Sequence, residues 1–343
     1  MRLRPQRPSD GILSGESADV YFRRAQTILE REGLDPIVTV EVFGRAAGVL
    51  CGIDEAKGLL AHALVDGLPA ETLVEGLDDG DTVATREVVL RVRARYRQFG
   101  LYETAVLGMI AQATGWATAA RECVDAAAPQ PVICFGARHV HPDVADVLDY
   151  AAIVGGCVGA STPAGARLAG LNPTGTMPHA LVLVIGDTVE AALAFDRDVD
   201  PGIPRIVLVD TFRDEAEEAL RVAEALGERL HGIRLDTPAE RGRVTAELVG
   251  EVRARLDQAG HGHVRIVVSG GLTPDRIRDF RERGAPADSY AVGSYISGAG
   301  PIDFTADIKE IDGRPIAKRG RIPGMTPSPR LRPIDLAAWR EGS

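Results

Sequence analysis

From residue 131 to residue 294 the chain repeats one pattern, in which a short apolar run is followed by an amphipathic helical stretch. Apolar runs without polar alternation are typical of strands that are buried on both faces of a parallel sheet. The runs are PVICFGAR (131–138), AAIVGGCVGAS (151–161), IPRIVLVD (203–210), LHGIRLD (230–236), HVRIVVSGG (263–271) and DSYAVGS (288–294). These six runs, or seven if ALVLVIG (180–186) is also a strand, predict an incomplete or irregular parallel α/β barrel of the TIM type.

The sequence on either side of this region reads differently and predicts a second, α+β domain. DDGDTVATREVVLRVRARY (78–96) alternates like a hairpin around a Gly-Asp turn, and residues 102–127 form a long apolar stretch that predicts a helix. The Pro-rich tail after residue 320 is expected to extend over the surface. We therefore predict an N-terminal domain at 1–130, with 301–343 packing back on it, and a barrel domain at 131–300.

Composition excludes several classes of protein. The net charge of −10 argues against a nucleic-acid partner, and no apolar run approaches the roughly 20 residues of a membrane span, so a cytoplasmic location is expected. The four cysteines lack CxxC spacing, which favours reduced buried thiols over a zinc site or disulfides. Only three lysines occur, and none lies between residues 131 and 294, which argues against a Schiff-base enzyme.

Polar or glycine residues end the apolar runs. Catalytic residues of α/β barrels lie at the C-terminal ends of the strands, so these residues are expected to line one site. They are Arg138, Ser161, Asp210, Arg234, Asp236, Ser269, Gly270, Gly271, Gly293 and Ser294.

The two glycine endings, VVSGGLTPDRI and AVGSYIS, predict a phosphate site. Glycines expose backbone amides, and Pro274 suits the first turn of a following helix, whose N-terminus attracts anions. Ordinary strand-to-helix turns would explain either loop alone, but two such loops on the last strands are typical of phosphate-binding barrels.

Asp210 and Asp236 end neighbouring runs and leave several roles open. Two carboxylates there could hold Mg²⁺, orient ribose hydroxyls or stabilise a cationic transition state, and either could instead be a helix N-cap. Arg234 alternates with Asp236, so both side chains could point into the barrel. His139 and His141 have a metal-compatible spacing, but no third ligand is obvious, so no metal site is expected there.

His179 lies in GTMPHALVLVIG, between a Thr-Gly-Thr turn and an apolar run. A core histidine with a local hydrogen bond would explain it, but its place among the strand-end residues favours a role in the site. Thr176 in the preceding turn is then a candidate anion contact.

Several of these motifs, taken in order, resemble the nicotinate phosphoribosyltransferase family, especially its shorter prokaryotic branch. The motifs are ADVYFRRAQTIL, YETAVLG, FGARHVHP, GTMPHAL, LVDTF, GIRLDTPAERG, VSGGL, AVGSYIS and IAKRG. The resemblance implies transfer of phosphoribose from phosphoribosyl pyrophosphate to nicotinate in NAD salvage, with Mg²⁺ and with ATP as a co-substrate. It also implies a homodimer or larger homo-oligomer with a shared active site.

The same resemblance implies roles for individual residues. Tyr21 would reach the site of a partner subunit and, with Phe135, sandwich the pyridine ring. Arg138 would hold anionic groups, and Ser161 would favour an acid over an amide. His179 would be phosphorylated by ATP or would contact pyrophosphate. His139 departs from the family pattern, which often has a second arginine at its position.

Two other functions remain as alternatives. Quinolinate phosphoribosyltransferase forms the same product with decarboxylation but is expected to need lysines and arginines for two carboxylates, and the barrel region has no lysine. A non-catalytic phosphosugar or nucleotide sensor could keep the phosphate loops, but His179, Arg234 and Asp236 together argue against a loss of catalysis.

Overall fold

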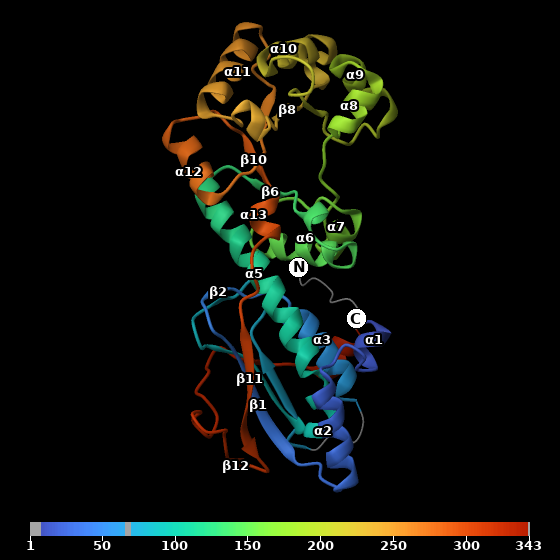
Figure 1. The fold of residues 1–343 in the computed structure, drawn as a ribbon, viewed down its shortest axis with the longest axis vertical. Helices are drawn as coiled ribbons and strands as arrows, with labels where there is room; N and C mark the ends of the chain where they lie inside the picture. The colour runs from blue at the N-terminus through green and yellow to red at the C-terminus, as the bar shows by residue number, and fades with distance from the viewer. Residues whose placement is uncertain (1–7, 66–69, 342–343) are drawn as a thin grey trace. The chain divides into compact units, whose positions relative to one another are not determined.

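The computed structural model describes residues 8–65 and 70–341, and the chain forms two compact units (Figure 1). The first unit comprises Met1–Thr118 and Ala299–Ser343, and the second comprises Ala119–Gly298. One unit contains an antiparallel sheet and the other a parallel sheet, which confirms the predicted fold class of an incomplete α/β barrel with a second α+β domain.

The first unit is built on a six-stranded sheet with the order β12-β11-β1-β5-β3-β13. A separate two-stranded sheet is formed by β2 and β4. The strands of the unit are β1 (Ile37–Gly44), β2 (Gly48–Val49), β3 (Leu73–Gly76), β4 (Thr82–Val83), β5 (Val88–Arg95), β11 (Phe304–Ile311), β12 (Arg314–Pro315) and β13 (Arg332–Pro333). Its helices are α1 (Asp10–Leu13), α2 (Val20–Arg31), α3 (Ile53–Ala63), α4 (Tyr96–Phe99), α14 (Leu336–Glu341) and the first part of α5 (Glu103–Ala127).

The hairpin predicted within residues 78–96 does not form. β4 pairs with β2, while β5 pairs antiparallel with both β1 and β3. The alternating residues do form a strand, β5, as predicted. The residues after the Gly-Asp turn instead form β4, which pairs with β2 in a separate two-stranded sheet, so the predicted pairing within 78–96 was wrong. The long helix predicted at 102–127 is confirmed as α5.

The core of this unit contains one face of β1, where every second residue is a valine, together with apolar residues of α5. Val38, Val40 and Val42 are each at most 6% exposed and share one hydrophobic cluster with Val106 and Ile110 of α5 (Figure 1). Each buried aliphatic side chain of this size stabilises the fold by about 1.5–3 kcal/mol.

Glu103 is the first residue of α5, and its carboxyl group should make the free energy of unfolding depend on pH. Burial, with repulsion from Asp307, raises the pKa of the Glu103 carboxyl to about 7, against the opposing effect of Lys318. Because the folded pKa exceeds the unfolded value, stability is full at low pH and falls as the pH rises from the unfolded pKa through 7. We expect Glu103→Gln to have a higher free energy of unfolding than wild type. This difference should be about 2 kcal/mol larger at pH 8 than at pH 5. Urea unfolding at both pH values measures this, and an equal difference at the two pH values would contradict it.

The second unit contains a five-stranded parallel sheet with the order β6-β10-β9-β8-β7. Its strands are β6 (Val132–Cys134), β7 (Ile206–Leu208), β8 (Gly232–Leu235), β9 (Arg265–Val268) and β10 (Ser289–Val292). Its helices, besides the end of α5, are α6 (Ala145–Val154), α7 (Pro163–Leu168), α8 (His179–Ile185), α9 (Thr188–Asp198), α10 (Glu215–Leu226), α11 (Ala246–Gln258), α12 (Pro274–Glu282) and α13 (Ser294–Ser297).

Side-chain caps explain where the helices between these strands begin. Asp214 accepts from two backbone amides at the start of α10, and Thr245 and Thr273 each accept from one at the starts of α11 and α12. Each such cap stabilises its helix by about 1 kcal/mol. Asp210 and Asp236 are therefore not the N-caps of these helices, which removes one of their alternative roles.

Two of the predicted strands are not strands. The run at 151–161 begins as the end of α6, and only its last residues lie beside β6, where the Val158 amide donates to the Val132 carbonyl over 2.9 Å. The run at 180–186 forms α8, since Gly186 adopts a φ of 95° and ends a helix in the usual left-handed conformation. Both runs are short and apolar, a pattern that does not separate strand from helix.

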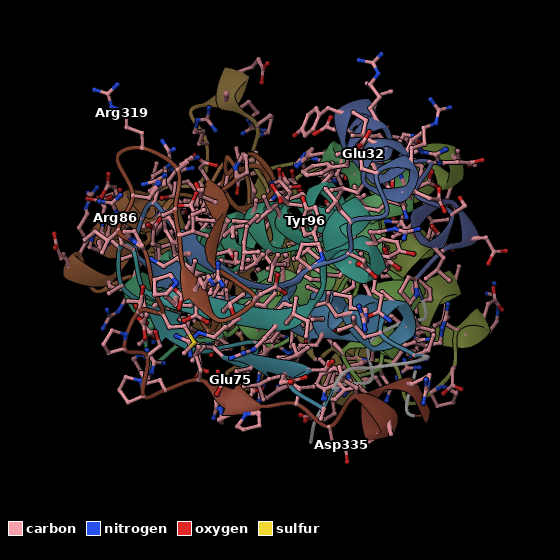
Figure 2. All side chains as sticks on the ribbon, turned by 90° about the horizontal axis from the view of Figure 1, so that it is seen from below. Glu32, Glu75, Arg86, Tyr96, Arg319 and Asp335 are labelled. Carbon is pink, nitrogen blue, oxygen red and sulfur yellow. The ribbon has the colours of Figure 1, made fainter. Side chains whose placement is uncertain are left out.

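The C-terminal tail is largely exposed but is not wholly irregular. β13 pairs antiparallel with β3, and Arg319, just before the tail, extends into solvent (Figure 2). The four cysteines are free and buried, as predicted. Within the described ranges, no helix has the length and apolar character that crossing a bilayer requires.

Candidate active site

The C-terminal ends of the parallel strands open onto a cavity of about 640 Å³, lined only by residues of the second unit. The lining residues that directly follow a strand are Phe135, Asp236, Ser269 and Gly293. All the predicted site residues except Asp210 and Tyr21 line it. They are Phe135, Arg138, Ser161, Thr176, His179, Arg234, Asp236, Ser269, Gly270, Gly271, Gly293 and Ser294.

His179 begins α8 and faces the cavity with a buried carboxylate behind it. Its Nε2 lies 3.0 Å from Oδ2 of Asp210, and the two side chains are 37% and 2% exposed. The hydrogen bond to Asp210 raises the pKa of the His179 imidazole above its ordinary value, because it outweighs the opposing effect of burial. The geometry therefore supports an imidazole that keeps its proton to higher pH than a free histidine.

Asp210 follows β7 but does not line the cavity. Its Oδ2 is taken by His179, and its Oδ1 is buried without a hydrogen-bond partner among the described residues. Asp210 is thus placed to orient His179 rather than to contact a ligand. Asp236 lines the cavity with 27% of its side chain exposed, so it is the carboxylate that can meet a cation or ribose hydroxyls.

Arg234 lies on β8 with its guanidinium at the cavity wall. Its Nη1 donates to Oγ1 of Thr176 over 2.7 Å, and its Cζ lies 5.8 Å from the centre of the Phe135 ring. Burial lowers the pKa of the guanidinium, with Asp236 opposing that effect. Its Nε is buried without a partner among the described residues. A buried guanidinium with spare donors in a cavity is suited to an anion.

The first glycine loop, Gly270–Gly271, has a backbone conformation suited to an anion site. Gly270 and Gly271 have φ of 89° and 61°, which residues with side chains rarely adopt. Pro274 is at the first turn of α12, as predicted. The hydroxyl of Ser269 donates to the Leu235 carbonyl over 3.0 Å, so Ser269 holds the loop to β8, and Gly270 and Gly271 line the cavity.

His139 connects Arg138 to the second glycine loop. Nε of Arg138 donates to Nε2 of His139 over 3.3 Å, and Nδ1 of His139 lies 3.0 Å from Oγ of Ser297. Because an arginine can only donate, the neutral His139 accepts at Nε2 and donates from Nδ1. Ser297 in turn donates to the Gly293 carbonyl over 3.2 Å. Where the family resemblance expected a second arginine, this histidine orients the first.

Ser161 is positioned by a residue that the sequence did not point to. Asp149 of α6 is completely buried, and it accepts from the hydroxyl of Ser161 over 3.3 Å and from the amide and hydroxyl of Thr162 over 2.8 Å each. Both partners line the cavity. Asp149 lies mid-helix, twelve residues before Ser161, and no local pattern marks it.

We expect Asp149→Asn to lower the free energy of unfolding by about 1–3 kcal/mol, because an amide cannot accept from all of these donors. Chemical denaturation measures the change. Asp146→Asn on the same helix is the matched control and should cost less than about 0.5 kcal/mol. Equal stability of Asp149→Asn and wild type would show that Asp149 does not hold this loop.

Tyr21 lies on α2 of the first unit, 57% exposed, with its hydroxyl donating to Asp19 over 3.0 Å. It is not among the residues that line the cavity. α2 has no buried residue, although it is strongly amphipathic. Whether Tyr21 completes the site of a partner subunit stays a prediction.

Comparison with known proteins decides the family. Residues 116–307 match the model of the quinolinate phosphoribosyl transferase C-terminal domain, and residues 19–114 match that of the N-terminal domain. The chain belongs to this family. A solved structure from Pyrococcus furiosus, titled nicotinate-nucleotide pyrophosphorylase, is 41% identical with a TM-score of 0.84, over 95% of this chain and 82% of that one.

Two other relatives are more distant. Nicotinate phosphoribosyltransferase pncB1 of Mycobacterium tuberculosis is 33% identical over 93% of this chain and 77% of its own length. Human nicotinic acid phosphoribosyltransferase is 19% identical with a TM-score of 0.71, over 90% of this chain and 77% of that one, and it shows the fold alone. The chain is thus a member of a family of phosphoribosyltransferases.

The assignment to the nicotinate phosphoribosyltransferase family, with nicotinate transfer as the activity, is wrong. Both family models and the Pyrococcus structure support the quinolinate phosphoribosyltransferase family, which was weighed as the rival. The argument against that family was the missing lysine. That argument does not hold, because Arg138 and Arg234 line the cavity and a guanidinium group can also bind a carboxylate.

Proposed function

We propose that this protein transfers phosphoribose from phosphoribosyl pyrophosphate to quinolinate, releasing pyrophosphate and carbon dioxide and forming nicotinate mononucleotide. The observation that carries the proposal is one cavity, in a member of this family, that combines glycine phosphate loops with the buried guanidinium of Arg234 and the exposed one of Arg138. The two guanidinium groups are suited to the two carboxylates of quinolinate.

The reaction needs positioning and charge more than acid–base chemistry. The pyridine nitrogen is already a nucleophile, and it forms the bond to the anomeric carbon while the bond to the pyrophosphate oxygen breaks. Positive charge builds on the ribose, which the carboxylate of Asp236 can stabilise, and negative charge builds on pyrophosphate, which a protonated His179 can meet. After transfer, the carboxylate next to the ring nitrogen departs as carbon dioxide and leaves its electron pair on the ring carbon. The adjacent cationic nitrogen stabilises that pair, and the carbon then takes up a proton from water.

Magnesium would enter with phosphoribosyl pyrophosphate. No cluster of three or more metal-ligating side chains occurs among the described residues, but the carboxylate of Asp236 fits a shared ion of this kind. Magnesium would neutralise the departing pyrophosphate, and a protonated His179 would contact its oxygens. The resemblance to nicotinate phosphoribosyltransferases implied ATP as a co-substrate. The proposed reaction does not need ATP, so its use stays an untested prediction.

We propose further that the active form is a homodimer or larger homo-oligomer. The exposed Tyr21 on the amphipathic α2 supports an approach of this helix to a second copy. Sedimentation of wild type and Tyr21→Ala measures this, and an active monomeric wild type would contradict it.

Steady-state assays test the proposed reaction. Purified protein is mixed with phosphoribosyl pyrophosphate, Mg²⁺ and quinolinate, nicotinate or nicotinamide, with and without ATP. We expect the highest kcat/KM with quinolinate, independent of ATP. Turnover of nicotinate without turnover of quinolinate would overturn the substrate, and binding without turnover of any would overturn the activity.

A further inference from the structure

Glu215 is a buried carboxylate that neither caps a helix nor lines the cavity. It is the first residue of α10 and 3% exposed, while the cap of this helix is made by Asp214. A buried carboxylate is costly unless donors satisfy it. Oε1 of Glu215 accepts from the hydroxyl of Thr237 over 2.7 Å, and its Oε2 lies 3.8 Å from Nη2 of the exposed Arg241. The short contact of this carboxylate is therefore the one with Thr237.

Thr237 connects Glu215 to the cavity. It directly follows Asp236 in the chain, and it is 4% exposed, whereas Asp236 lines the cavity. Of these two neighbours, one is available to a ligand and the other is buried against α10. The hydrogen bond from Thr237 to Glu215 thus ties the end of β8 to the start of α10.

The Asp236 carboxylate is held only weakly by the side chains that the structure describes. Nη2 of Arg234 lies 3.5 Å from its Oδ2, which is a long and weak hydrogen bond. A Cβ placed on Gly270 would lie 3.1 Å from Oδ1 of Asp236 and 3.6 Å from the Thr237 carbonyl oxygen. The carboxylate therefore lies against the bare backbone of Gly270, and its position depends on the backbone to which it is attached.

That backbone is fixed on both sides of Asp236. Before it, the Leu235 carbonyl accepts from the amide and the hydroxyl of Ser269 over 2.9 and 3.0 Å. After it, the Thr237 hydroxyl is held by Glu215. A displacement of about 1 Å at a reacting group can cost roughly 100-fold in rate, so a contact that sets such a position has a large effect on turnover.

We propose that Glu215 is a positioning residue, which acts through Thr237 to hold the Asp236 carboxylate at the cavity wall in the orientation that phosphoribosyl transfer needs. The proposal rests on the proposed function in assigning Asp236 to the positive charge that builds on the ribose. It does not depend on which pyridine acid is used. Glu215 acts through its neighbours alone, because it does not line the cavity.

Steady-state kinetics of paired variants tests this. The double variant Glu215→Met, Thr237→Val removes acceptor and donor together, so neither is left unpaired in the interior and the chain should fold. We expect its kcat to fall about 10-fold, with KM for quinolinate changed less than about twofold. Glu215→Gln and Thr237→Ser keep the hydrogen bond and should retain most of the kcat. The matched control, Glu217→Ala, removes an exposed carboxylate of the same helix and should behave as wild type.

Removal of Asp236 separates positioning from a merely structural role. In an Asp236→Ala background, the double variant should cause no further loss of kcat, because the group that is positioned is gone. An equal loss in that background and in wild type would overturn the proposal. Wild-type kcat in the double variant itself would do the same.

Crystal structures of wild type and of the double variant give a readout that needs no turnover. The Asp236 carboxylate should lie beside Gly270 in wild type and leave that place in the double variant. A carboxylate that stays in place would show that Glu215 does not position it. Absence of quinolinate turnover by wild type would count against the proposed function instead, and the place of Asp236 would still decide this proposal.

Discussion

Arg234→Ala is expected to lower kcat/KM about 100-fold, which corresponds to about 3 kcal/mol of lost transition-state stabilisation. The guanidinium is buried beside the cavity, donates to Thr176 and keeps Nε without a partner among the described residues. In such a site a charge acts at low dielectric and is aligned before the substrate arrives, so its removal should affect turnover more than folding. Steady-state kinetics with quinolinate as the varied substrate measures the change.

Two variants make the Arg234 result specific. Arg234→Lys keeps the charge but loses the planar fork, so we expect a loss of about 10-fold. Arg265→Ala removes an exposed arginine at the N-terminal end of β9, away from the strand ends that form the cavity, and should leave kcat/KM unchanged. If Arg234→Ala and Arg265→Ala have the same kinetics as wild type, Arg234 is a structural residue.

His179→Ala is expected to lower kcat about 100-fold with the fold intact, because the imidazole is the side chain placed to meet the charge on departing pyrophosphate. His179 is partly exposed and makes no cap of α8, so the fold should form without it, but the melting temperature should fall because the buried Asp210 carboxylate loses its hydrogen-bond partner. Kinetics and thermal unfolding of the same preparation separate the two effects. Unchanged kcat would assign His179 to a local structural contact.

Asp210→Asn tests the partner of His179 without opening a cavity. The Asp210 carboxylate raises the pKa of the imidazole, so the neutral amide should lower that pKa and shift the alkaline limb of the pH profile to lower pH. Activity at acidic pH should be affected much less than activity above neutrality. A profile with an unmoved alkaline limb would show that the protonated His179 is not the active form.

The strand ends could be predicted from the sequence because continuous apolar runs followed by polar or glycine residues carry a local pattern. That pattern located Asp236, Ser269 and Gly293 without any contact information. It failed at 151–161 and 180–186, which are equally apolar. The first run begins as the end of α6, and the second forms α8, which ends at Gly186.

The residues that were missed act across long sequence separations. Asp149 is buried in α6 and contacts the cavity lining through Ser161 and Thr162, which lie more than ten residues later in the chain. No spacing rule brings such pairs together. The family was misassigned for a different reason, since a lysine was required where a guanidinium can serve.

The central claim is decarboxylating transfer, and carbon dioxide release tests it most directly. Purified protein is supplied with Mg²⁺, phosphoribosyl pyrophosphate and quinolinate labelled in the carboxylate next to the ring nitrogen. We predict one labelled carbon dioxide for each nicotinate mononucleotide formed, without ATP. Nucleotide formation from nicotinate with no carbon dioxide released from quinolinate would contradict the account.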